Sequence, residues 1–240
     1  MLDWLIFGHH IFSPWWLGPL DVLILWLARW GLVIGLFTLL RRLRGPPVPP
    51  GQVRRELAAL LRASVVAMLF VYVFRVLLLY LGVPLPYREV ATHGWNHWWF
   101  SAAVLLFGLD LYFYVLHRWL HRGWAYRRIH AVHHLSAHTG PTTSLSFHPL
   151  EAVALFSFLH IVEIFIPIHY GLAQLFYWAV IIHTTAIHTG VPILPWAPAF
   201  VNAYPHHADH HRHGDRNFGL IFSLWDRVCG TDGPREEKRQ

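Results

Sequence analysis

The stretch DLYFYVLHRWLHRGWAYRRIHAVHH, residues 110–134, runs from an apolar segment directly into five histidines. These are His117 and His121, four residues apart, and the H-x-x-H-H set His130, His133 and His134. If both pieces are helical, the spacing projects each set from one face of its helix. Imidazoles grouped in this way predict a metal site.

A second H-x-x-H-H set, His207, His210 and His211, lies near the end of the chain. The sequence has one cysteine, Cys229, so we expect no internal disulfide and no cysteine-held zinc or iron–sulfur site. Histidine must therefore supply the ligands, and neutral imidazole suits iron, zinc and copper rather than calcium or magnesium. One metal ion takes roughly four to six ligands, so the histidines of the three sets predict two metal ions.

The composition indicates a membrane protein. Apolar residues make up 55% of the chain and charged residues 13%, whereas about a quarter of the residues of a soluble protein are charged. The formal net charge is +6, but the basic residues flank apolar runs and do not gather on a polar surface. We therefore expect a membrane environment and no nucleic-acid partner.

Three apolar runs are long enough to cross a bilayer, since about 20 helical residues span its hydrocarbon core. They cover residues 17–40, 57–81 and 98–116. Two further apolar stretches, 150–168 and 170–187, follow, and the first contains two glutamates, which makes it too polar to face lipid. The predicted fold class is an all-α integral-membrane helical bundle with about three spans, a helical hairpin and a histidine-rich metal-binding cap.

Basic residues in the loops assign the sides of the membrane. Segments 41–56, 117–149 and 191–240 contain five, four and six Arg or Lys, against one in segment 82–97. Basic loops favour the cytoplasmic side, so the histidine sets are expected to meet on the cytoplasmic face. The domains expected are N-terminal membrane helices at 1–94, a catalytic domain at 95–232 and a polar tail at 233–240.

Further candidates lie near these sets. His188 is the best ninth ligand and His183 a weaker tenth. Asp110, seven residues before His117, faces nearly the same way and is expected either to accept a hydrogen bond from a ligand imidazole or to bind Ser, Tyr or Arg inside the bundle. His148 has two interpretations, as a ligand or its neighbour and as a loop cap. We take Asp110 and His148 as candidate catalytic residues.

The order of these motifs resembles the fatty acid hydroxylase/sterol desaturase superfamily. The late H-x-x-H-H is closely followed by Asn217-Phe218-Gly219 and Trp225-Asp226-Arg227. The segments TTSLSFHPLE and VNAYPHHADHHRHGDRNFG are similar to those of the C5-sterol desaturase branch. The resemblance covers residues 95–232. It implies an integral-membrane enzyme with two iron ions that uses O2 and externally supplied electrons to hydroxylate or desaturate a sterol-like or fatty-acyl lipid.

Carried over position by position, the ligands of the superfamily fall on His117, His121, His130, His133, His134, His207, His210 and His211, with His188 as a further ligand. The segment HTTAIH departs from the pattern because its two histidines are five residues apart, which leaves open whether His183 or His188 binds metal. His206 is an alternative to a neighbouring ligand. The sequence contains no ferredoxin-like or cytochrome b5-like segment, so the electron donor is expected to be a separate protein of one of these kinds.

Two other functions are compatible with many histidines in a membrane. A haem protein that passes electrons needs one histidine on each of two spans, which does not explain two H-x-x-H-H sets. A zinc transporter places its ligands near the bilayer midplane, and a zinc hydrolase usually adds a carboxylate base beside the metal. The histidine sets lie instead at the ends of the apolar runs.

Overall fold

The structure is a computed structural model that describes residues 18–83, 86–193, 198 and 200–233. Residues 1–17 of the expected N-terminal domain, and all but the first residue of the expected polar tail, lie outside the described part of the chain.

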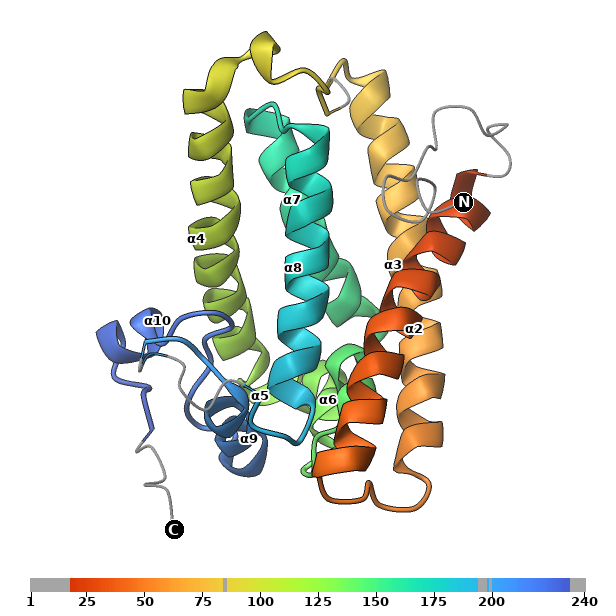
Figure 1. Ribbon diagram of the computed structural model, residues 1–240, viewed down its shortest axis with the longest axis vertical. Coiled ribbons are helices and arrows are strands. Elements are labelled where there is room, and N and C mark those ends of the chain that lie inside the picture. Colours follow the sequence, from red (N-terminus) through yellow and green to blue (C-terminus); the bar gives the residue numbers. More distant parts are fainter. Residues whose placement is uncertain (1–17, 84–85, 194–197, 199, 234–240) are drawn as a thin grey trace.

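Five long helices form the body of the protein. They are α2 (Gly18–Arg44), α3 (Gln52–Tyr80), α4 (Gly94–Leu120), α7 (Pro149–Phe165) and α8 (Tyr170–His188). All five run roughly along the long axis of the molecule (Figure 1), and α3 packs against both α2 and α7. The described residues contain no strand, only two isolated bridges between single residue pairs. The predicted all-α bundle is confirmed.

Three of these helices are long and apolar enough to cross a membrane, and they are the three predicted from the sequence. They cover Val22–Arg44 within α2, Gln52–Tyr80 and Gly94–Leu120. Each helix extends beyond its apolar run because backbone hydrogen bonding continues into neighbouring polar residues, which follow the run in α2, precede it in α3 and flank it on both sides in α4. The basic residues of the last turn of α2 also interact favourably with the negative end of the helix dipole.

The last two long helices, α7 and α8, form the predicted hairpin, and their polar residues are buried in the bundle. Glu163 of α7 is paired with Arg75 of α3, with 3.0 Å between Oε2 and Nη1. The turn between the two helices is held by backbone hydrogen bonds between Tyr87 and residues 168 and 170. The hairpin therefore begins and ends at one end of the molecule, where His148 precedes α7 and His188 closes α8.

Short helices cap that same end. They are α5 (Gly123–Ala125), the π-helical turn η3 (Tyr126–His130), α6 (Ala131–His134), the 3₁₀ turn η4 (Pro141–Leu145), α9 (Tyr204–His213) and α10 (Leu224–Val228); the 3₁₀ turn η2 (Val90–Thr92) precedes α4. Figure 1 shows α5, α6 and α9 grouped around the lower end of α8. Arg41 at the end of α2 donates to the carbonyl oxygens of Thr139 and Thr189, which ties three segments of this end together.

Two apolar clusters fix the helix ends that carry histidine. Trp26 and Trp30 of α2 pack with residues of α3, α7 and α8 in the first cluster. Leu105 and Leu109 of α4 pack against α7 and α8 in the second. Van der Waals packing between such side chains holds membrane helices together, and here it sets α4 and α8 side by side, so that their histidine-bearing ends meet.

Candidate metal centre

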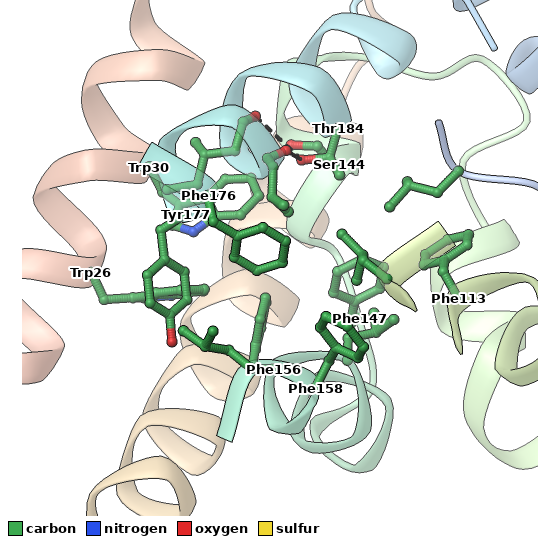
Figure 2. Close-up of a pocket in the computed structure, with 16 residues that line it drawn as sticks. Trp26, Trp30, Phe113, Ser144, Phe147, Phe156, Phe158, Phe176, Tyr177 and Thr184 are labelled. Atoms are coloured by element: carbon green, nitrogen blue, oxygen red, sulfur yellow. Dashed lines mark hydrogen bonds between the residues drawn. The ribbon is translucent and has the colours of Figure 1, made fainter. Parts of the chain in front are cut away.

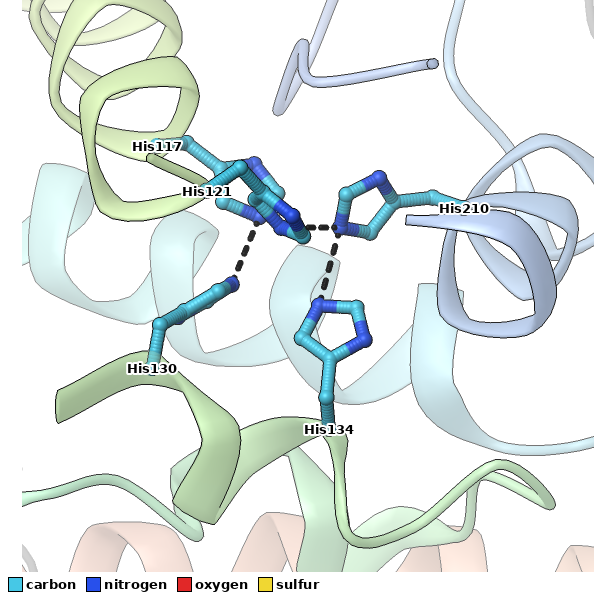
Figure 3. A group of neighbouring side chains, drawn as sticks. All are labelled: His117, His121, His130, His134 and His210. Carbon is cyan, nitrogen blue, oxygen red and sulfur yellow. Dashed lines mark hydrogen bonds between the residues drawn. The ribbon is translucent and has the colours of Figure 1, made fainter. Parts of the chain in front are cut away.

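Five histidines converge at the end of α4. The group consists of His117, His121, His130, His134 and His210, and one ring nitrogen of each lies within 4.8 Å of those of the others. Figure 3 shows the five rings pointing toward a common centre from α4, from the segment of η3 and α6, and from α9. We call this set the five-histidine group.

Four other histidines form a second cluster beside it. His133, His188, His207 and His211 are all buried, and their ligand nitrogens also lie within 4.8 Å of one another. The ring centroids of His134 and His211, one from each cluster, are 4.7 Å apart. We call this set the four-histidine group, and the two groups are neighbours.

Each H-x-x-H-H motif contributes to both groups. His130 and His134, four residues apart, belong to the five-histidine group, whereas His133 belongs to the four-histidine group. The second motif divides in the opposite sense, with His207 and His211 in the four-histidine group and His210 in the other. Each helical residue turns about 100°, so residues four apart share a direction and the third points elsewhere. The motif thus bridges two adjacent sites, which the expectation of one shared face did not include.

Hydrogen bonds to main-chain carbonyls orient the rings of the five-histidine group. Nδ1 of His117 lies 2.8 Å from the carbonyl oxygen of Phe218, and Nδ1 of His210 lies 2.7 Å from that of Arg216. A carbonyl oxygen only accepts, so in both rings Nδ1 carries the proton. In the neutral ring, Nε2 then presents a lone pair to the centre of the group.

The inner nitrogens face one another with lone pairs and no proton between them when the outer nitrogen of each ring carries the proton. Nε2 of His210 lies 3.1 Å from Nε2 of both His121 and His134. The rings of His121 and His134 hydrogen-bond the backbone of Gly214 and His211. Lone pairs that face one another at this distance repel, and a bound cation converts this repulsion into coordination. The donor set therefore fits a metal ion that imidazole binds well.

Burial keeps these imidazoles neutral. It lowers the pKa of His121 to about 3 and that of His134 to about 2, and neighbouring His130 adds to both effects. Burial also lowers the pKa of His210 and His211 well below the ordinary value. Neutral rings are the form that binds metal, so at neutral pH protons do not compete for these nitrogens.

The four-histidine group centres on His188. Its Nδ1 lies 2.6 Å from the carbonyl oxygen of Thr184, so this nitrogen donates and Nε2 is free to bind metal. That Nε2 lies 2.8 Å from Nε2 of His207 and 3.3 Å from those of His133 and His211. The Nδ1 atoms of these last three rings are buried and have no hydrogen-bond partner in the described part of the chain. One nitrogen surrounded by three others again fits a cation.

An apolar cavity, whose lining residues are drawn in Figure 2, lies among the long helices. Its walls come from α2, α4, α7, α8 and the residues just before α7. Phe113 in its lining lies 5.0 Å, centroid to centroid, from the ring of His117, and Phe147 lies 4.9 Å from that of His133. The cavity therefore lies directly beside one ring of each histidine group.

Residues 102–231 match the family model described as fatty acid hydroxylase. The chain belongs to the fatty acid hydroxylase family. The matched segment contains every histidine of the two groups, and the resemblance predicted from the motifs is confirmed.

Proteins similar in sequence to this chain include enzymes named for sterol oxidation or desaturation. The chain is 36% identical to lathosterol oxidase of Mus musculus over 140 residues, which cover 58% of this chain and 47% of that protein. It is 32% identical over 155 residues to the Delta(7)-sterol 5(6)-desaturase erg32 of Schizosaccharomyces pombe, with coverages of 62% and 45%. The chain thus spans about half the length of these relatives. No solved structure matches it significantly.

Three residues that the sequence predicts as part of the site, His183, Asp110 and His148, lie outside both histidine groups. Nε2 of His183 lies 2.9 Å from the carbonyl oxygen of Leu220. Asp110 Oδ1 accepts from the backbone N–H groups of Ile221 and Phe222, so its partners are a loop and not a ligand imidazole. Nδ1 of His148 accepts from the backbone N–H of Leu150 and caps α7, as the loop-cap interpretation predicts.

His206 also lies outside both groups, with Nε2 3.7 Å from a carboxylate oxygen of Asp226. Asp226 itself is buried and accepts from the backbone N–H groups of Phe218 and Gly219. These bonds hold the loop whose Phe218 carbonyl accepts from His117. Asp226 is not among the site residues predicted from the sequence, although its position in the motif Trp225-Asp226-Arg227 was an available signal.

A second residue was missed altogether. Glu151 accepts a hydrogen bond from Nδ1 of His130 at 2.7 Å, and both side chains are 2% exposed. From the sequence we considered Glu151 only as a polar residue in an apolar helix. Its position within the segment TTSLSFHPLE, which carries part of the family resemblance, was the signal that could have identified it.

Proposed function

We propose that this chain is a membrane-bound oxidoreductase that hydroxylates or desaturates a sterol-like or fatty-acyl lipid with two iron ions, O2 and electrons from a separate carrier. The observation that carries the proposal is the pair of adjacent, all-histidine groups at the end of an apolar cavity. When bound there, the iron pair would supply the activation of O2 that removes hydrogen from an unreactive C–H bond. The chain supplies the ligands, the orientation and the exclusion of water.

The proposed ligands are the nine histidines of the two groups. We assign His188, and not His183, as the ligand from the segment HTTAIH, because Nε2 of His188 lies at the centre of the four-histidine group. The two histidines are five positions apart, which corresponds to about 140° around α8, so the two rings point in different directions. His183 donates to the carbonyl oxygen of Leu220 instead.

Asp110 and His148 act, in this proposal, by placing other groups. Asp110 binds the backbone at 221 and 222, next to the loop whose Phe218 carbonyl accepts from His117. His148 caps the first turn of α7, three residues before Glu151. Neither residue needs to touch the substrate for its loss to disturb a ligand.

The cavity supports a hydrocarbon substrate. Its labelled lining in Figure 2 is mostly aromatic, with the hydroxyl groups of Ser144 and Thr184 at one side. The Thr184 hydroxyl donates to the carbonyl oxygen of Val180 in its own helix. Few polar groups remain to hold a hydrophilic ligand, so the apolar lining favours a hydrocarbon such as a sterol ring system or an acyl chain. The names of the relatives favour a sterol.

We place the histidine end on the cytoplasmic side of the membrane. Arg41, Arg42 and Arg44 end α2 at this end, and Arg54 and Arg55 follow in the first turns of α3. Such basic ends favour the cytoplasm. A soluble ferredoxin-like or cytochrome b5-like carrier would then reach the metal pair from the cytoplasm.

The two alternatives fit this geometry less well. In a haem site, axial imidazoles stand on opposite faces of a flat macrocycle, but here the ring nitrogens face one another at 2.8 to 3.3 Å. The two groups contain histidine only, and the nearby Glu151 is bonded to a ligand ring, so a free carboxylate base for zinc hydrolysis is not provided by these residues.

The test is the lipid profile of cells that express the wild-type chain or the variant His133→Ala. We expect a sterol or acyl lipid that gains one oxygen atom or loses two hydrogen atoms in wild-type cells only, because His133 belongs to the four-histidine group. Mass spectrometry of total lipids gives the substrate and the reaction together. An identical lipid profile from equally expressed wild type and variant would overturn the proposal.

A further inference from the structure

We propose that Glu151 is a positioning residue for the five-histidine group, whose carboxylate orients His130 and strengthens metal binding there. This inference rests on the proposed metal site and adds to it a residue that does not itself bind the metal. Metal-binding histidines commonly donate their outer N–H to a carboxylate, which fixes the ring and raises its basicity.

The geometry of the pair assigns the direction of the hydrogen bond. Oε1 of Glu151 lies 2.7 Å from Nδ1 of His130. An ionised carboxylate only accepts, so Nδ1 donates. Nε2 of His130 then points to the centre of the group, where it lies 3.1 Å from Nε2 of His117. His117 is fixed in the same sense by Phe218, so the two inner nitrogens offer their lone pairs to the same point.

Among the rings of the two groups, His130 has an unusual partner. His117, His188 and His210 lie against main-chain carbonyl oxygens. Three rings of the four-histidine group, as stated above, have no partner at Nδ1 among the described residues. Among the residues that the structure describes, Glu151 is thus the one acidic residue whose carboxylate is hydrogen-bonded to a ring of either group.

The second carboxylate oxygen of Glu151 also points to a nearby positive charge. Oε2 is buried and has no hydrogen-bond partner in the part of the chain that the structure describes. A buried charge without full compensation costs free energy unless an opposite charge lies near. The nine imidazole ligands are neutral, so they would leave the charge of two divalent metal ions uncompensated. The negative charge of Glu151 and the positive charge of a metal ion bound to His130 would stabilise one another.

The start of helix α7 determines the position of Glu151. Pro149 begins α7 and His148 caps it, so Glu151 falls in the first turn, where the helix dipole favours an acidic side chain. The adjacent Ala152 is completely buried, which keeps this turn close to the neighbouring segments. The carboxylate is therefore held against η3, where His130 ends the π-helical turn.

The experiment compares Glu151→Gln with Glu56→Gln in the purified full-length protein, loaded with Co²⁺ and then challenged with increasing chelator. Glu56 is a matched control because it is also fully buried and hydrogen-bonded, to Gln52, Thr142 and Thr143, but bonds no histidine. We expect wild type and Glu56→Gln to keep two ions. Glu151→Gln should release one of its ions at a chelator concentration about 10-fold to 100-fold lower.

A second readout separates positioning from a general loss of structure. The visible absorption of bound Co²⁺ depends on its ligands, so it should change in Glu151→Gln while Glu56→Gln matches the wild type. If Glu151→Gln does not fold, Glu151→Asp replaces it, and its shorter carboxylate should still weaken retention of one ion.

Two outcomes distinguish the hypotheses. Wild-type chelator resistance and spectrum in the Glu151 variant would overturn the role of Glu151 and leave the metal centre intact. Failure of the wild type to bind Co²⁺ would instead overturn the proposed metal centre on which this inference rests.

Discussion

His188→Gln should abolish lipid oxidation, whereas His183→Gln should retain it. Nε2 of His188 lies within 3.3 Å of three other imidazoles, and losing it removes the central ligand of the four-histidine group. Loss of an outer hydrogen bond alone costs roughly 10-fold to 100-fold in metal affinity or activity, so loss of this ligand should exceed about 100-fold. The measurement is product formed per amount of protein, with metal content determined on the same samples.

The His183 variant is the matched control. Both residues lie on α8, and glutamine keeps a side-chain N–H donor that can bond the carbonyl oxygen of Leu220. We expect His183→Gln to hold two metal ions and to remain active. The reverse pattern, with activity lost in His183→Gln and kept in His188→Gln, would move the ligand assignment to His183.

Thr184→Phe should reduce turnover strongly without removing metal. Thr184 lines the apolar cavity one helical turn before His188, and its hydroxyl bonds only its own helix. A phenyl ring at this position fills space that the substrate needs, and a misfit in a hydrophobic substrate pocket costs about 1 to 3 kcal/mol, which corresponds to roughly 10-fold to 200-fold in kcat/KM. Turnover of the lipid identified from the cell profile is the measurement.

Ile182→Phe is the corresponding control on the same helix. Ile182 is 47% exposed and does not line the cavity, so the added ring extends away from it. We expect wild-type turnover and metal content from this variant. Equal turnover in Thr184→Phe and the wild type would show that the substrate does not occupy this cavity.

The helices could be predicted from the sequence because they depend on local patterns. The three apolar runs correspond to α2, α3 and α4, and the polar residues of 150–168 indicated a helix inside the bundle. Nine of the ten predicted metal ligands lie in the two groups because the helical spacing of histidine carries that information. Only the boundaries differed, since the helices continue into the polar residues beyond each apolar run.

The partners of individual side chains could not be predicted, because they depend on contacts distant in sequence. Asp110 lies seven residues before His117 and so faces nearly the same way, but its carboxylate accepts hydrogen bonds from the backbone N–H groups of residues 221 and 222 instead of from the imidazole. Glu151 meets His130 across 21 residues of chain. The choice between His183 and His188 depends on which face of α8 turns toward the other helices. The orientation of α8 about its own axis cannot be predicted from the sequence alone.

The proposed function requires the two histidine groups to hold two iron ions. The most direct measurement is the metal content and optical spectrum of the full-length protein purified from iron-supplied cells. We expect two iron ions per chain and no Soret band. One metal ion per chain, or a stoichiometric haem, would contradict it.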